Sequence, residues 1–136
     1  MAAGDVHKQY DYLAIDGYCK TNTAITKGTL CDWNGDGFAA ATDAVAHGFV
    51  VALDDKAAVA STQYTLKWLA KGVVEIYKVT TMNLKVGDCV MPSATAGAVT
   101  KWIVSNAIDA GQNLGMVLEE ASTTATTVKV LFSGGY

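Results

Sequence analysis

A glycine-punctuated pattern occurs twice in this chain, first from Gly28 to Asp55 and again from Gly87 to Glu120. Each copy opens with a glycine and a short apolar stretch, turns at a second glycine (Gly37 or Gly97), and closes on an apolar run and two carboxylates. Such a period indicates one small supersecondary unit used twice, because each copy alone is too short to bury its apolar face. We expect each unit to consist of a strand, a turn and a strand.

Short apolar or alternating runs, bounded by glycine and turn residues, predict strands along most of the chain. The clearest alternation places Tyr64, Leu66 and Trp68 on one face, and we expect Trp68 and Trp102 in the core. Two segments, 54–69 and 105–112, have the composition to begin as helical turns. The predicted strands are Thr29–Trp33, Phe49–Leu53, Gln63–Trp68, Val73–Thr80, Cys89–Met91, Val99–Val104, Met116–Leu118 and Thr127–Phe132. The sequence therefore predicts an all-β fold, a compact β-barrel or β-sandwich.

The length of 136 residues suits one domain with its own core. Residues 1–24 are polar and aromatic without a clear period, and we interpret them as an extended N-terminal arm. Residues 25–136 are then a single β domain that contains both repeats.

The charge pattern excludes several classes of function. The formal net charge is −3 and no run of Lys or Arg occurs, which argues against a nucleic-acid partner. No stretch reaches the roughly 18 apolar residues of a membrane helix, and the N-terminus lacks the pattern of a signal peptide. Only 17% of residues are charged, and a weakly charged surface favours binding to other proteins.

The three cysteines have no metal-binding spacing, and their odd number argues against a complete disulfide framework. We interpret them as small apolar residues of a chain made in a reducing cytoplasm. A bridge between Cys19 and Cys31 stays open as an alternative.

One segment has the order of ligands found in a calcium-binding loop. Asp32, Asn34 and Asp36 stand at alternate positions, followed by Gly37 and then Asp43, which replaces the usual glutamate. The flanking residues do not predict the two helices that such a loop needs, and Asn-Gly and Asp-Gly equally predict a hairpin turn. We therefore expect a hairpin and no cofactor, with Ca²⁺ as the alternative.

No set of residues predicts catalysis. His7 and His47 have no metal-type or nucleophile-type neighbours. The pairs Asp54-Asp55 and Glu119-Glu120 point to opposite faces if extended, so we expect them to mark where strands leave the core. The chain is therefore predicted not to be an enzyme.

The order of the glycine steps resembles that of the small capsid decoration, or cement, proteins of tailed phages and related viruses. The steps are Lys27-Gly28, Gly48–Leu53, Gly72–Ile76, Val86–Val90, Gly115–Glu119 and Thr127–Val130. The resemblance implies a virion protein, made in the host cytoplasm, that binds the outer surface of an assembled capsid. It implies that the protein bridges subunits of the major capsid protein and associates with itself, as a homotrimer or alternatively a dimer.

The aromatic N-terminal arm is the predicted contact with the capsid or with a neighbouring copy. The contact residues that we predict are Tyr10, Tyr12, Leu13, Ile15 and Tyr18. The alternative function is a carbohydrate-binding or adhesive β-module that contains Trp33 and is stabilised by calcium.

Overall fold

The computed structural model describes residues 2–6, 12–42, 48–102 and 113–133. The regular secondary structure of these residues consists of strands alone, so the predicted all-β fold is confirmed. The strands are β1 (Leu13–Cys19), β2 (Leu30–Asn34), β3 (Gly37–Ala40), β4 (Phe49–Ala52), β5 (Tyr64–Tyr77), β6 (Cys89–Pro92), β7 (Val99–Lys101), β8 (Gly115–Val117) and β9 (Thr127–Phe132). A helix that is long and apolar enough to cross a membrane is absent from the same ranges.

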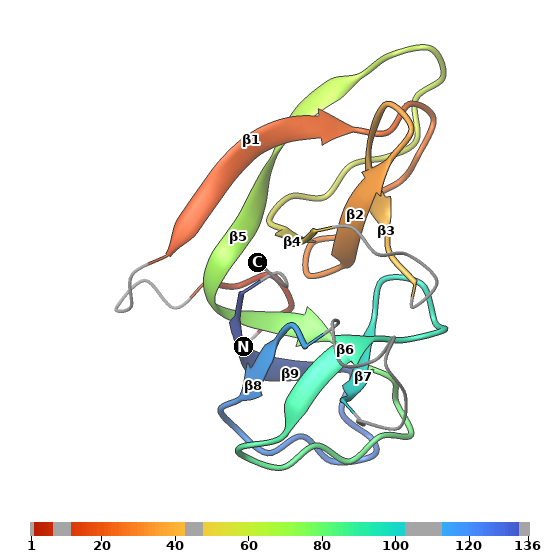
Figure 1. The fold of residues 1–136 in the computed structure, drawn as a ribbon. Helices are drawn as coiled ribbons and strands as arrows, with labels where there is room; N and C mark the ends of the chain where they lie inside the picture. Colours follow the sequence, from red (N-terminus) through yellow and green to blue (C-terminus); the bar gives the residue numbers. More distant parts are fainter. Residues whose placement is uncertain (1, 7–11, 43–47, 103–112, 134–136) are drawn as a thin grey trace.

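The strands form one sheet in the order β1-β3-β2-β4-β5-β9-β8-β6-β7. Because β1 also pairs with β5, the first five strands close into a ring. Directly after β5, Lys78 forms a parallel bridge with Val99 of β7, which closes a second ring from β5 to β9. Figure 1 shows the two rings one above the other, with β5 running from the first into the second.

Each ring is the same five-strand unit, and the two units share β5. The second strand of a unit pairs antiparallel with the third and the fourth, as β2 does with β3 and β4 and as β6 does with β7 and β8. The first strand meets the third in parallel, through Cys19 and Phe38 in one unit and Lys78 and Val99 in the other. The last strand pairs antiparallel with the first and the fourth. The predicted repeats, 28–55 and 87–120, are therefore the middle three strands of a longer duplicated unit.

The turn before the second strand of each unit shows the same duplication in its individual hydrogen bonds. Gly28 and Gly87 both have a φ of +92°, a conformation that favours glycine. The Gly28 amide donates to the Ala52 carbonyl at 2.8 Å, and the Gly87 amide donates to the Val117 carbonyl at 3.0 Å. In each unit, the glycine amide therefore joins the start of the second strand to the end of the fourth by a hydrogen bond.

Equivalent residues of the two units keep one spacing along the chain. The spacing that separates Gly28 from Gly87 also separates Cys19 from Lys78 and Ile25 from Leu84. Ile25 exchanges two backbone hydrogen bonds with Lys56, and Leu84 exchanges two with Ala121. This spacing identifies, for each residue of β1 and β2, the equivalent residue of β5 and β6.

Residues 2–6, which we call the N-terminal strap, lie along β5 where β5 belongs to the second unit. Val6 forms an antiparallel bridge with Val74. The Gly4 amide donates to the Glu75 carbonyl at 2.6 Å, and the Glu75 amide donates to the Asp5 carbonyl at 3.2 Å. The strap therefore covers the edge of β5 that β9 leaves open.

Strand β5 is continuous where the sequence predicted two strands separated at Gly72. Gly72 has a φ of +145°, and a side chain there would place Cβ 2.7 Å from the Cβ of Tyr12. Glycine lets the strand change direction and lets the chain before β1 approach closely. The residue that was interpreted as a boundary is therefore the bend that carries one strand through both units.

Strand β4 is buried along its whole length because both of its faces are covered. Val50 and Ala52 pack inside the first ring with Trp68. Phe49 and Val51 belong to the larger core cluster, which extends into the second unit. This double burial explains the uninterrupted apolar run in the sequence.

Two tryptophans, two possible helical segments and strand β3 remain to be compared with the prediction. Trp68 is fully buried, as predicted, whereas Trp102 is half-buried. The segment 54–69 contains no helix but includes the start of β5, and 105–112 lies outside the described residues. Strand β3, with the sequence Gly-Phe-Ala-Ala, was not predicted, since two alanines give little β signal.

Candidate interaction surface

Strand β1 carries most of the residues that were predicted to contact a partner. The exposed ones are Tyr12, Leu13 and Tyr18, at 46, 52 and 50% of their full surface. Ile15 is half-buried and packs against the core of the first ring, and Tyr10 lies outside the described residues. Strand β1 pairs with β5 along its whole length, so this part of the predicted arm lies in the sheet of its own chain and presents its outer side chains to solvent.

A chain of ring contacts supports the exposed Trp33 of β2. The Trp33 ring meets the Phe38 ring edge-on, with centroids 5.4 Å apart and planes at 89°. The Phe38 ring lies 4.8 Å from the ring of buried Trp68, whose indole N–H donates to the Gly17 carbonyl at 2.9 Å. Trp33, 44% exposed, is therefore held in place and would lose little side-chain entropy in a contact with another molecule.

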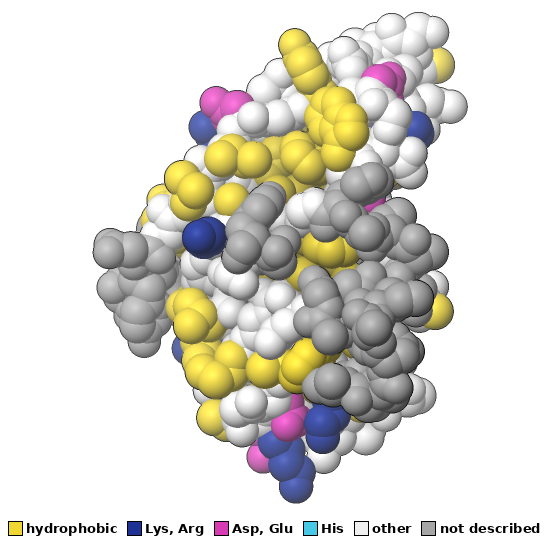
Figure 2. All heavy atoms as spheres, viewed as in Figure 1, with side chains coloured by type: hydrophobic (Ala, Val, Ile, Leu, Met, Phe, Trp, Pro, Cys, Tyr) yellow, Lys and Arg dark blue, Asp and Glu magenta, His cyan; other side chains and the backbone are white. Residues whose placement is uncertain are grey.

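A hollow of about 440 Å³ lies between β1 and the β2–β3 hairpin, and we call it the β1 hollow. Its lining consists of Ile15, Asp16, Gly17, Tyr18, Trp33, Phe38 and Thr65. Figure 2 shows hydrophobic side chains gathered along β1 and over the upper part of the first ring. Exposed tyrosine and tryptophan beside a hollow are typical anchors of protein interfaces.

The edge of β1 that borders this hollow has backbone groups directed away from β5. The Lys20 amide donates to the Phe38 carbonyl of β3 at 3.0 Å, on the side opposite β5. Backbone groups two residues apart in a strand point the same way, so those of Tyr18 and Asp16 also point away from β5. In the described parts of the chain, only Cys19 of β1 pairs with β3. Among the described residues, no other backbone pairing covers this edge, and an uncovered strand edge can pair with another strand.

The predicted calcium segment contains the tip of the β2–β3 hairpin. Asn34 pairs with Gly37 across the turn, and Gly35 has a φ of +73°, as the first position of a type II′ turn requires. Of the two readings that the sequence left open, the hairpin is the one that the backbone of these residues forms.

The carboxylates of the predicted calcium segment have different surroundings. The Asp36 carboxylate accepts hydrogen bonds from the Thr21 hydroxyl at 2.5 Å and from the Thr21 amide at 3.3 Å. These bonds lower the pKa of Asp36. Asp32 is buried in β2, and Asp43 lies outside the described residues. Over the described ranges, no three His, Cys, Asp or Glu side chains come together as a metal site.

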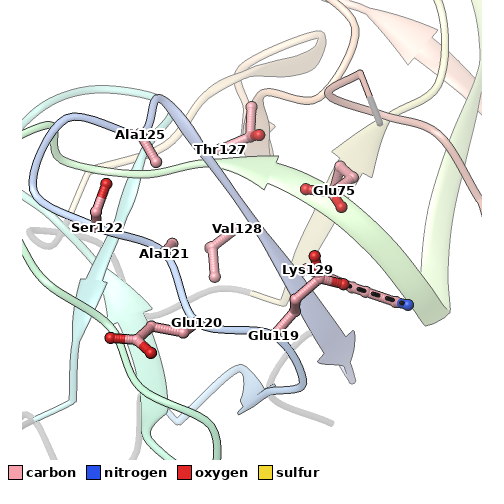
Figure 3. A pocket seen from close by; sticks show the side chains of 9 residues that line it. All are labelled: Glu75, Glu119, Glu120, Ala121, Ser122, Ala125, Thr127, Val128 and Lys129. Carbon is pink, nitrogen blue, oxygen red and sulfur yellow. Dashed lines mark ion pairs between the residues drawn. The ribbon is translucent and has the colours of Figure 1, made fainter.

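A second hollow, of about 460 Å³, lies against β9 and the turn that follows β8 (Figure 3). Glu75 of β5 is only 8% exposed, and burial raises its pKa. Lys129 pairs with Glu119 at 3.8 Å, while Glu120 lies across the hollow from Glu75. Both Glu119 and Glu120 are exposed just after β8, as expected for residues that mark where a strand leaves the core.

The three cysteines are free thiols. Cys19 and Cys31 are buried, and burial raises the pKa of both. Cys89 is half-buried. The two histidines, His7 and His47, lie outside the described residues.

The sequence did not indicate four residues that complete the β1 hollow, namely Asp16, Gly17, Phe38 and Thr65. Phe38 is in the strand that was not predicted, and Thr65 lies opposite Tyr18 on a strand far along the chain. The only local signal is the glycine at position 17, where a Cβ would lie 2.8 Å from the Phe38 ring. Close approach of that kind cannot be assigned without the pairing of β1.

The sequence matches no protein-family model, and the curated proteins contain no match to it. Among solved structures, the fold is similar to the N base of head fiber gp8.5 in bacteriophage phi29. The TM-score is 0.61 at 14% sequence identity, over 90% of this chain and 97% of the other. The described chain therefore has the fold of a phage head fiber base along nearly its whole length.

Proposed function

We propose that this chain is a structural protein of a phage virion that attaches to the outer surface of the capsid. One observation carries the proposal: the fold matches the N base of a head fiber over almost the full length of both chains. The order of glycine steps in the sequence, which resembles that of capsid decoration proteins, supports the same conclusion independently of the three-dimensional comparison.

The surface suits attachment to a large protein lattice. Trp33 and Tyr18 are exposed beside the β1 hollow, and only 17% of residues are charged. On a capsid, the same contact is repeated many times, so modest individual affinities suffice when copies also contact one another.

The finer part of the proposal is a cement role. In it, the protein bridges subunits of the major capsid protein and associates with itself, as a homotrimer or a dimer. The two-ring body supports this role because an exposed apolar surface on each ring gives one chain two places to contact neighbours. On the second ring the surface includes Met116 and Leu131, which are 40 and 46% exposed and face each other across β8 and β9.

Binding to purified capsids tests the proposal. The chain is mixed with capsids that lack it, the capsids are sedimented, and bound protein is measured at several concentrations. We expect saturable binding, and a Tyr18→Ser, Trp33→Ser double variant to bind at least about tenfold more weakly, because central aromatic contacts contribute about 2 kcal/mol or more.

The control is Val86→Ser, which changes an exposed apolar residue just before the turn of the second ring. We expect its affinity to stay within about threefold of the native chain, a difference below 1 kcal/mol. Failure of the native chain to bind capsids contradicts the function itself. Loss of binding in the control alone instead moves the contact to the second ring.

The exposed Trp33 also favours a second candidate function, a carbohydrate-binding module, because aromatic faces beside polar groups bind sugar rings. Asp16 and Thr65 supply such polar groups in the β1 hollow. Glycan-array binding that Trp33→Ser abolishes, in a chain that does not bind capsids, is the result that favours this alternative.

A further inference from the structure

We propose that the open edge of β1 accepts an extended segment of the capsid partner as an additional antiparallel strand. This inference rests on the proposed function and adds to it a mode of binding and a register. It follows from comparing the two units of the duplicated fold, because the equivalent edge in the second unit is already occupied.

In the second unit, the occupant is the N-terminal strap of the chain itself. The strap runs antiparallel to β5, bridges Val74 through Val6, and exchanges backbone hydrogen bonds with Glu75. The ion pair between Lys27 and Asp5, at 3.1 Å, holds the strap to the turn of the first unit. The fold therefore already contains one example of an extended segment added at this position.

At the constant spacing between the units, Val74 corresponds to Ile15 and Glu75 to Asp16. The Glu75 amide and carbonyl both bond to the strap, whereas no described residue pairs with β1 on that side before Cys19. The backbone groups of Asp16 therefore point into a place that the strap fills in the second unit and that no described residue fills in the first.

The β1 hollow has the size and lining that an added strand needs. Its volume of about 440 Å³ runs along Ile15–Tyr18, and its far side is the Trp33 and Phe38 ring pair. Because side chains alternate across a strand, a guest strand here would place alternate residues against these rings. The chemistry that fits is a short extended segment with apolar or small residues at every second position.

The strap of a second copy is not the occupant, because the strap of each copy is already bound to its own second unit. The occupant is therefore assigned to the capsid, the partner in the proposed function. Strand addition gives affinity through main-chain hydrogen bonds and register through the alternate side chains. Each bound copy would thereby extend its sheet into the capsid subunit beneath it.

Asp16→Pro is the most specific test. Proline removes the outward amide of Asp16, and an edge strand tolerates proline where the amide faces away from its neighbour. Asp16→Ala is the matched control, since it keeps the amide and removes only the ion pair with Lys67, in which both side chains are more than 60% exposed. We expect Asp16→Pro to weaken capsid binding at least about tenfold, because it removes one interfacial hydrogen bond and adds steric bulk, and Asp16→Ala to bind at least severalfold more tightly than Asp16→Pro.

Amide hydrogen exchange of the native chain provides a second measurement that does not depend on how the proline variant folds. In the free chain, the amides of Asp16 and Tyr18 should exchange fast while those of Gly17 and Ile15, directed at β5, exchange slowly. On capsid binding, the two fast amides should become at least about tenfold slower.

The outcomes separate the two claims. If the native chain does not bind capsids, the proposed function fails, and this inference fails with it. If the native chain binds and Asp16 and Tyr18 keep their fast exchange, or Asp16→Pro binds like Asp16→Ala, only strand addition is overturned. Slow exchange of both amides in a self-associated sample without capsids overturns the assignment of the occupant and places a second copy there.

Discussion

The pair Gly28 and Gly87 allows one backbone feature to be tested twice in the same molecule. Both residues have a φ of +92° and both begin the same turn. They differ in what covers them. A Cβ on Gly87 would meet nothing within 4 Å, whereas a Cβ on Gly28 would overlap the Cβ of Ala3 and lie 2.8 Å from the Gly4 amide nitrogen. Alanine substitutions therefore separate the cost of the conformation from the cost of displacing the strap.

Gly87→Ala should lower the free energy of unfolding only by the cost of holding alanine in a left-handed backbone conformation. A left-handed φ costs an L-residue about 1–2 kcal/mol, and the loss of unfolded-chain entropy offsets about 0.4–1 kcal/mol of it. The net destabilisation is then about 1 kcal/mol, or a fall in Tm of about 4 °C for a chain of this size.

Gly28→Ala should incur the same cost and a second one. Overlap with Ala3 forces the strap away from its place, and overpacking of this kind costs about 1–3 kcal/mol. The expected total is about 2–4 kcal/mol, with a fall in Tm of about 8–15 °C. Urea unfolding of both variants gives the free energies, and hydrogen exchange of the Gly4 amide reports directly on the strap.

We expect a fast-exchanging Gly4 amide in Gly28→Ala and a protected one in Gly87→Ala. Equal destabilisation of the two variants, with the strap protected in both, would refute the placement of the strap against the first turn. A larger loss for Gly87→Ala would refute the equivalence of the two turns.

Three further predictions concern buried groups. Trp68→Phe should lower the free energy of unfolding by about 1–3 kcal/mol, measured in urea, because the Gly17 carbonyl loses its indole donor; an unchanged value contradicts that role. Burial raises the pKa of Glu75, so the contribution of Glu75 to stability is most favourable below its unfolded-state pKa of about 4.3 and is lost as pH rises through its folded-state pKa. Glu75→Gln should therefore melt higher than the native chain at pH 7 and lose that advantage near pH 4, and a lower Tm at pH 7 would contradict this. A thiol reagent should label only Cys89 in the native chain and all three cysteines in denaturant, whereas rapid native labelling of the two buried thiols would contradict their burial.

The duplication could be predicted because glycine and burial leave local traces. Gly28 and Gly87 are visible in the sequence as the openings of two similar segments, and the run before Leu53 is apolar because β4 is covered on both faces. Most strands could be predicted from such short-range patterns. The full five-strand unit could not be predicted, because its first and last strands pair across long stretches of chain and one of them, β5, belongs to both units.

The candidate surface was predictable only in part, for the same reason. The aromatic residues Tyr12 and Tyr18 indicated a contact region, but their sequence does not show that β1 pairs with β5 or that its opposite edge is open. The role that we propose for Asp16 rests on its backbone groups and on its equivalence with Glu75, and no side-chain pattern encodes either of these. Gly72 shows the converse case, since a local signal that usually ends a strand here bends one.

A cryo-EM map of the virion that carries this chain tests the central claim most directly. We expect copies of the two-ring body on the outer capsid surface, with β1 of the first ring beside an extended segment of the capsid protein. A map of a complete particle with no such body on the capsid surface, or purified virions that lack the chain, would contradict it.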